Sequence, residues 1–187
     1  KDVFINWNRF SRYSSYIKIF SSLLCFKKSH RKQSLVQKHA SAERLMLKIV
    51  QQELFSIELK ALEKKTDLPV KSKLSKLSPF IDEYGLLRTK GRLQHSNLPY
   101  EQKHPIILLA NHPIVQLKLI HEHECNNHEG TEYVRSLIQQ QFWIIGLRNA
   151  LRQIKRNCVL CRKRDATTPK PQMADLPIER TISNVHP

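Results

Sequence analysis

Glycine, aromatic residues and acidic residues are all scarce in this chain of 187 residues. Glycine occurs 4 times and aromatic residues make up 7%, which disfavours a β-sandwich with its many turns and favours helices. Only 16 Asp and Glu residues stand against 32 Lys and Arg residues, so the net charge is +16. A surplus of this size indicates a polyanionic partner such as DNA or RNA, and a basic surface that only confers solubility is the alternative.

Long apolar segments are also missing. The apolar stretch Tyr16–Phe26 is about 11 residues long and contains Lys18, whereas a membrane-spanning helix needs about 20 residues. We find no signal peptide, and a total of four cysteines suits a reducing compartment. We therefore expect an intracellular protein without membrane attachment.

Signatures of common catalytic sites are absent from the sequence. It contains no Gly-x-Ser-x-Gly, no phosphate-binding loop and no His-Glu-x-x-His. None of its aspartates lies in an alternating strand pattern that could gather two metal ions. These aspartates are scattered over different predicted elements, at Asp2, Asp67, Asp82, Asp165 and Asp175. We expect no catalysis by this chain and no small-molecule substrate.

The first part of the chain, residues 1–68, is predicted to be helical. An apolar stripe at spacings of three and four predicts a helix over about 3–27, and a basic break follows it. Ser34-Leu-Val-Gln37 has the form of a capping box that starts a long helix over about 35–63. Facing stripes predict that the two helices pack as a hairpin. The first stripe consists of Trp7, Phe10, Tyr13, Ile17, Phe20 and Leu24.

A second segment, residues 78–110, follows a Lys- and Ser-rich linker at 69–77 and differs from the helical part in its residue pattern. Proline and glycine punctuate short apolar runs here. Asp82–Gly85 indicates a turn between two short strands, and Ile106–Leu109 is a plausible third strand. We expect a small β connector, which makes the fold mainly α with a small β element (α+β).

The spacing His123-x4-His128-x29-Cys158-x2-Cys161 is the most specific pattern in the sequence. Two imidazoles and two thiolates are the set that closes a tetrahedral zinc site. A Cys-x-x-Cys pair alone could be redox-active, but helical sequence lies between the two halves here. With all four positions filled by protein, one zinc ion would be structural and not catalytic.

Three helices are predicted in the segment 112–164 around this motif. The first begins at Pro113, the second at Gly130-Thr131 and the third near Leu147. The inner face of the third helix leads to Cys158. A domain of about this size has a marginal core, so we expect the metal to supply much of its stability. His121 and Cys125 are competing ligands, and otherwise Cys25 and Cys125 are ordinary thiols.

The outer face of the third helix and the thiol turn carry seven basic residues and no acid between 148 and 164. A solvated face normally mixes both signs, so we expect contact with phosphates, weakly dependent on base sequence. Simple exposure to solvent is the alternative. The residues are Arg148, Arg152, Lys155, Arg156, Arg162, Lys163 and Arg164.

The order of ligands, with the histidines first and a long gap, resembles the His-His-Cys-Cys domain of retroelement integrases. Further stretches resemble the integrase region of BEL/Pao-type retrotransposon polyproteins. They are Ser78–Arg88, Gly91–Leu93, Lys103–Leu108, His128–Gly130, Gln141–Ile144, Cys158–Cys161 and Met173–Arg180. The resemblance favours His123 over His121 as a ligand. It implies that 165–187 is a linker towards a catalytic core that this chain lacks, so that the chain is a truncated integrase.

The function implied by this resemblance is binding of the element's DNA ends and support of integrase multimers, in the nucleus or in a cytoplasmic virus-like particle. Two alternatives stay open. The chain could be a protein-interaction module whose charge is incidental, or a host DNA-binding protein that kept the zinc domain. Residues 1–75 could belong to the integrase or to the preceding region of the polyprotein.

Overall fold

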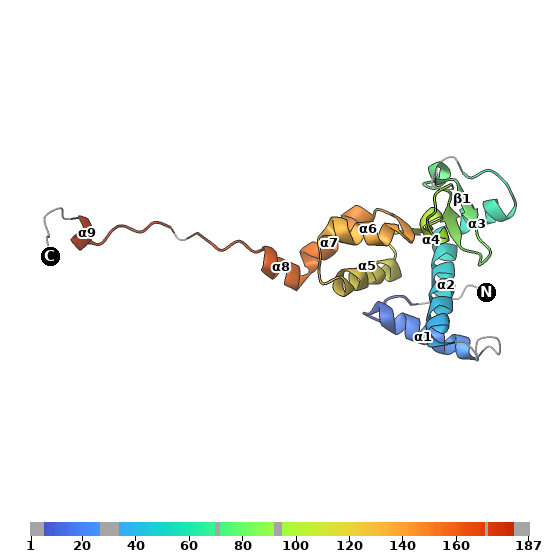
Figure 1. Cartoon of the computed structure of the whole chain (residues 1–187), viewed down its shortest axis with the longest axis horizontal. Helices are drawn as coiled ribbons and strands as arrows, with labels where there is room; N and C mark the ends of the chain where they lie inside the picture. Colours follow the sequence, from blue (N-terminus) through green and yellow to red (C-terminus); the bar gives the residue numbers. More distant parts are fainter. Residues whose placement is uncertain (1–5, 27–33, 70–71, 92–94, 171, 182–187) are drawn as a thin grey trace.

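The computed structural model describes residues 6–26, 34–69, 72–91, 95–170 and 172–181 (Figure 1). It is mainly helical with a small four-stranded mixed sheet, which confirms the predicted fold class. After residue 165 the chain is extended and leads away from the other elements to the short helix α9 (Ile178–Thr181) (Figure 1). None of the described helices has the length and apolar character that crossing a bilayer requires.

Helices α1 (Tyr13–Cys25) and α2 (Leu35–Leu54) pack against each other, as the facing stripes predict. The capping box at the start of α2 is confirmed. The Gln37 N–H donates to the Ser34 hydroxyl at 3.3 Å, and the Ser34 N–H donates to the Gln37 side chain at 3.1 Å.

Helix α1 begins at Tyr13, although the stripe predicts a helix from about residue 3. Trp7 is buried in a turn ahead of α1, where its indole N–H donates to Glu53 at 2.7 Å and its ring stacks on Phe20. The Tyr16 hydroxyl donates to the Trp7 carbonyl. Trp7 thus takes its place in the core through tertiary contacts and not through helix formation. The rest of the predicted start, 3–5, and residue 27 lie outside the described residues.

The long helix predicted over 35–63 is two helices. Helix α2 ends at Leu54, Phe55 leaves helical geometry with φ −130° and ψ 35°, and α3 (Ser56–Glu63) follows. The Phe55 side chain is buried with Leu59 in a second apolar cluster, completed by Leu74, Leu87 and Ile107. Burial of this ring against the sheet explains the break, because a straight continuation of α2 would carry Phe55 and Leu59 away from this cluster.

The sheet has four strands in the order β1-β2-β3-β4. They are β1 (Pro79–Ile81), β2 (Leu87–Thr89), β3 (Ile106–Leu109) and β4 (Phe142–Ile145). The first three pair antiparallel and match the predicted connector, with the 3-10 turn η2 (Ser75–Leu77) and helix α4 (Tyr100–Lys103) beside them in sequence. The fourth strand was not predicted. It pairs parallel with β3 over all four of its residues.

The helices that carry the metal motif are arranged around this parallel pair. Helices α5 (Pro113–Cys125) and α6 (Thr131–Gln139) form the crossover from β3 to β4, and α7 (Leu147–Asn157) and α8 (Val159–Asp165) follow β4. The main apolar cluster is continuous from α1 and α2 through the sheet to α5, α6 and α7. The metal-binding helices therefore share this apolar cluster with α1 and α2, whereas the sequence led us to expect a separate and marginal core. The division into domains at 78–110 and 112–164 stays a prediction.

One buried amide joins α2 to the sheet. Gln51 is 1% exposed, and its side-chain NH2 donates to the carbonyls of Leu87 and Ile107 at 2.9 and 2.8 Å. Its side-chain oxygen accepts from the Leu87 N–H at 2.7 Å. A single side chain thus satisfies backbone groups of two neighbouring strands.

Replacing Gln51 with Ala should lower the free energy of unfolding by about 3 kcal/mol, because it leaves buried backbone groups without partners. The change is measured as a shift of the urea midpoint. Gln52→Ala is the matched control, since Gln52 is exposed on the same helix. Equal midpoints for the two variants would contradict the assigned role of Gln51.

Candidate metal centre

Parallel pairing of β3 and β4 places the two halves of the motif at the same distance from one edge of the sheet. The paired strands run in one direction, so α5 and α7 both leave from the same edge of the sheet. His123 is ten residues beyond the first residue of α5, and Cys158 is eleven residues beyond the first residue of α7. At a rise of about 1.5 Å per residue, both ligands lie about 15 Å along their helices.

His128 reaches the same point through a turn in left-handed backbone geometry. Asn127 has φ 53° and His128 has φ 59°, a region where Asn and His are the more frequent non-glycine residues. The His128 N–H donates to the His123 carbonyl at 3.0 Å, which closes the end of α5. The turn therefore returns the second imidazole towards the first.

Cys158 and Cys161 come from the junction of α7 and α8. The N–H of Cys158 still bonds to the Ile154 carbonyl at 2.9 Å, while its own carbonyl accepts from the Arg162 N–H at 3.0 Å and starts α8. Both sulfurs therefore lie in the first turn of α8, where the free N–H groups of the helix favour negative charge.

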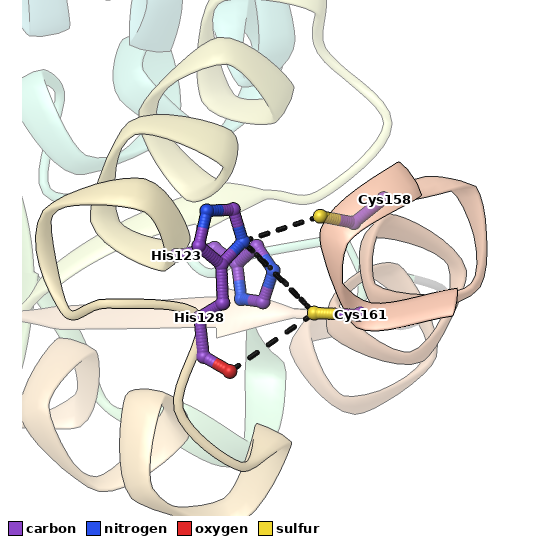
Figure 2. Close-up of side chains that lie close together, drawn as sticks. All are labelled: His123, His128, Cys158 and Cys161. Carbon is purple, nitrogen blue, oxygen red and sulfur yellow. Dashed lines mark hydrogen bonds between the residues drawn. The ribbon is translucent and has the colours of Figure 1, made fainter. Parts of the chain in front are cut away.

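The four predicted ligands converge, and one ligand atom from each lies within 4.8 Å of all the others (Figure 2). His128 Nδ1 is 3.1 Å from His123 Nε2 and 3.2 Å from Cys158 Sγ. Cys161 Sγ is 3.3 Å from His123 Nε2 and 3.9 Å from His128 Nδ1. Of the described residues, only these form a group of three or more potential ligands so close together.

These separations fit the edges of a zinc tetrahedron. Bonds of about 2.05 Å to nitrogen and 2.3 Å to sulfur give edges of about 3.3 Å between two nitrogens and about 3.6 Å between nitrogen and sulfur. The observed nitrogen–sulfur distances of 3.2, 3.3 and 3.9 Å bracket the second of these edges, and the nitrogen–nitrogen distance of 3.1 Å is slightly shorter than the first. The donor set is two nitrogens and two sulfurs, which suits zinc and leaves no position for water. The cluster is thus that of one structural zinc ion.

Burial shapes the protonation of the ligands. Burial, and then the neighbouring His128, lower the pKa of His123, so its imidazole is neutral and can bind a metal at neutral pH. Burial, and then contact with Cys158, raise the pKa of the Cys161 thiol. A metal ion must therefore displace a thiol proton when it binds, which couples affinity to pH.

Arg164 supports the cluster from outside. Its Nη2 donates to the His128 carbonyl and lies 4.0 Å from Cys161 Sγ. A guanidinium beside a metal-bound thiolate offsets its negative charge and holds the His128 turn in place. Arg164 is therefore engaged at the metal centre, in contrast to the free basic side chain that the sequence indicates.

The competing ligands lie elsewhere. His121 stacks on Tyr13 of α1 with ring centroids 5.8 Å apart, and Cys125 lies 3.6 Å from His121 Nε2. Neither belongs to the four-residue cluster. His121 and His123 are two residues apart in α5, so their side chains point about 200° apart around the helix axis. His123 is therefore the one that faces the other ligands.

Fewer residues of the predicted basic face carry an unpaired charge than the sequence suggests. Arg148 pairs with Glu132 of α6 at 3.2 Å, and Lys155 pairs with Asp165 at 2.9 Å. Contact with Lys155 lowers the pKa of Asp165, which keeps that pair charged. Four exposed basic residues have no ion pair within the described part of the chain: Arg152, Arg156, Arg162 and Lys163.

Three of these four charges border a hollow beside α7 and α8, with a volume of about 820 Å³. Arg152, Arg156 and Arg162 line it together with the ion pair of Lys155 and Asp165. A second hollow, of about 750 Å³, borders the metal cluster, and apolar and amide side chains make up most of its lining. Apart from the metal ligands, Glu124 is its one ionisable residue.

The structure predicts one zinc ion per chain, lost on replacement of His123 with Ala or of Cys161 with Ser. Three remaining ligands hold the ion more weakly, so it should be lost on dialysis. Metal content measured by native mass spectrometry tests this. His121→Ala is the control and should retain the ion. Full retention of zinc by His123→Ala would refute the assignment.

Removing the metal should release α8 and the turn at 126–130 while the rest of the chain stays folded, because the main core extends to α1 and α2. Hydrogen exchange after chelation should show loss of protection in 126–130 and 158–165. Protection of α2 and β3 should persist. If exchange rose across the whole chain, or did not rise at all, the metal would not have the local stabilising role assigned to it.

Comparison with known families agrees with the geometry. Residues 116–167 match the family described as the integrase zinc binding domain, and this span contains all four ligands. No curated protein and no solved structure matches the chain. Residues 116–167 thus form an integrase zinc-binding domain of the H2C2 type, which is a non-catalytic module.

Proposed function

We propose that this chain is the non-catalytic front part of an integrase of a BEL/Pao-type retrotransposon, and that its zinc domain binds the DNA ends of the element. The family match to the zinc domain and the sequence resemblance outside it support this proposal. In the complete protein, residues 165–187 would connect the metal domain to a catalytic core. The protein would act in the nucleus or in a virus-like particle, and self-association would assemble integrase multimers.

The observation that carries the DNA-binding proposal is the hollow between α7 and α8. Three arginines line it, and none of the three has an ion pair within the described residues. Guanidinium groups bind phosphate oxygens in a bidentate way, and a hollow of this kind accepts a backbone phosphate. No element of this face presents a row of side chains to base edges, so recognition would depend little on sequence.

The metal is part of this surface because it fixes α8 against α7. Arg162 lies next to Cys161, while Arg152 and Arg156 lie on α7. Without zinc the two helices lose their common anchor, so the arginines would no longer converge. DNA binding is therefore expected to require the metal even though the metal does not contact DNA.

Binding of a short duplex, measured by fluorescence anisotropy at increasing salt, tests the proposal. The affinity should fall steeply with salt, with a slope of about 0.9 per phosphate contact. Replacing Arg152, Arg156 or Arg162 with Gln should reduce the slope by about 1 each. Arg148→Gln is the matched control, with a smaller effect because Arg148 pairs with Glu132.

Negligible binding at low salt, or a triple Gln variant that binds like the unmodified chain, would refute DNA binding by this face. The first result would favour the alternative of a protein-interaction module with incidental charge. Reading the coding sequence beyond Pro187 for an Asp, Asp and Glu catalytic core tests the assignment to an integrase.

A further inference from the structure

Amide side chains gather in the second hollow, the one of about 750 Å³ that borders the metal cluster. Asn111, Gln116, Gln153 and Asn157 all line it, and we call this space the amide hollow. Within the described part of the chain, the side-chain amides of Asn111, Gln153 and Asn157 have no hydrogen-bond partner. Gln116 donates through its Nε2 to the Ala110 carbonyl at 2.5 Å, which leaves its side-chain oxygen to accept. The hollow therefore offers both donors and acceptors to a ligand.

Aliphatic side chains form another part of the lining. Ile120 and Ile154 come from α5 and α7, while Val159 and Leu160 of α8 are 60% and 59% exposed. Of the described lining residues other than the metal ligands, only Glu124 is ionisable, so the lining has no cation to hold an anion. The matching ligand is a neutral group that has apolar surface and also carries donors and acceptors. An apolar side chain of a protein partner would cover the aliphatic part but leave the amides unpaired.

Helix α7 contributes side chains to this hollow and also to the arginine hollow, the one that Arg152, Arg156 and Arg162 line. Gln153 and Arg156 are three residues apart on α7, and residues at this spacing are surface neighbours with about 5–6 Å between their Cβ atoms. Asn157 is four residues beyond Gln153 and lies on the same side of the helix. A nucleic acid strand that binds Arg156 through a phosphate can therefore present a base to these two amides.

We propose that the amide hollow binds an unpaired nucleobase at the end of a DNA strand, while the arginines hold the neighbouring phosphates. Nucleobases are uncharged, pack on apolar side chains through their faces and carry donors and acceptors along their edges. A base that is already unpaired enters at the smallest cost, which favours a strand end over the interior of a duplex. Amide groups can turn to exchange donor and acceptor, so the hollow need not select one base. The inference deepens the proposed DNA binding and rests on it.

Two DNA probes that differ only in their bases test this proposal with the whole zinc-loaded chain. Both are short duplexes with an unpaired extension on each strand end in turn, made of adenines in one probe and of abasic sugars in the other. The two probes carry the same number of phosphates, so the arginines should bind them alike. In fluorescence anisotropy the adenine probe should bind at least about fivefold more tightly, because Asn and Gln side chains pair with the edge of adenine.

Gln153→Met and Asn157→Leu remove the amides and keep side chains of similar size. Each should lower the preference for the adenine probe by about threefold or more. The affinity for the abasic probe and its salt dependence should stay unchanged, since neither residue lines the arginine hollow. Zinc content and urea midpoint should also stay unchanged, because both side chains are exposed. Asn149→Leu is the matched control, since Asn149 is an exposed amide of α7 that lines neither hollow.

The outcomes separate this inference from the proposed DNA binding. Equal affinities for the two probes at both strand ends would overturn the inference and leave DNA binding by the arginines intact. The inference is also wrong if Gln153→Met and Asn157→Leu both keep the full preference, because the base then binds elsewhere. A chain that binds neither probe at low salt would refute the proposed DNA binding and the inference with it. The triple Gln variant of the arginine hollow should weaken binding of both probes by the same factor.

Discussion

The parallel pairing of β3 with β4 is the constraint on which the metal centre depends. It gives α5 and α7 a common starting edge, and their similar lengths then carry His123 and Cys158 to the same level. The 29 residues between His128 and Cys158 are occupied by α6, β4 and α7. The gap is long because the chain must run back to the sheet through α6, form β4, and then extend along α7 to the metal centre.

The sequence was sufficient for features that depend on local chemistry. The four ligands, the capping box at Ser34 and the inner face of α7 follow from residue type and helical spacing, and the structure confirms each of them. Strand β4 was missed because a short apolar run such as Phe142–Ile145 fits a strand or a buried helix equally well. Its partner β3 lies more than thirty residues earlier, and no local pattern reveals a parallel pairing.

Other differences also come from contacts between distant residues. Glu53 holds Trp7 outside α1 from 46 residues away. Phe55 ends α2 because it enters the second apolar cluster. The acids that neutralise Arg148 and Lys155 are Glu132 on α6 and Asp165 beyond the basic segment. A count of charges along α7 and the thiol turn cannot include such partners, so it overstates how many basic residues are free.

The shared core gives the metal a more limited role than it has in an isolated finger. Apolar burial runs from Trp7 to Ile154. We therefore expect packing to hold the sheet and the first helices together without zinc, and zinc to order only the outermost elements. Of the arginines that line the hollow, Arg162 lies on α8, while Arg152 and Arg156 lie on α7.

His123 and Cys158 lie at similar distances from the sheet along α5 and α7. This equality also determines where the chain can change length during evolution. Residues added between α6 and β4 would leave the level of both ligands untouched, so that loop can grow freely. One residue added within α7 would rotate Cys158 by about 100° and raise it by about 1.5 Å, away from the imidazoles. Natural variation in the 29-residue gap should therefore concentrate near Gln139–Gln141 and spare the two helices that support the ligands.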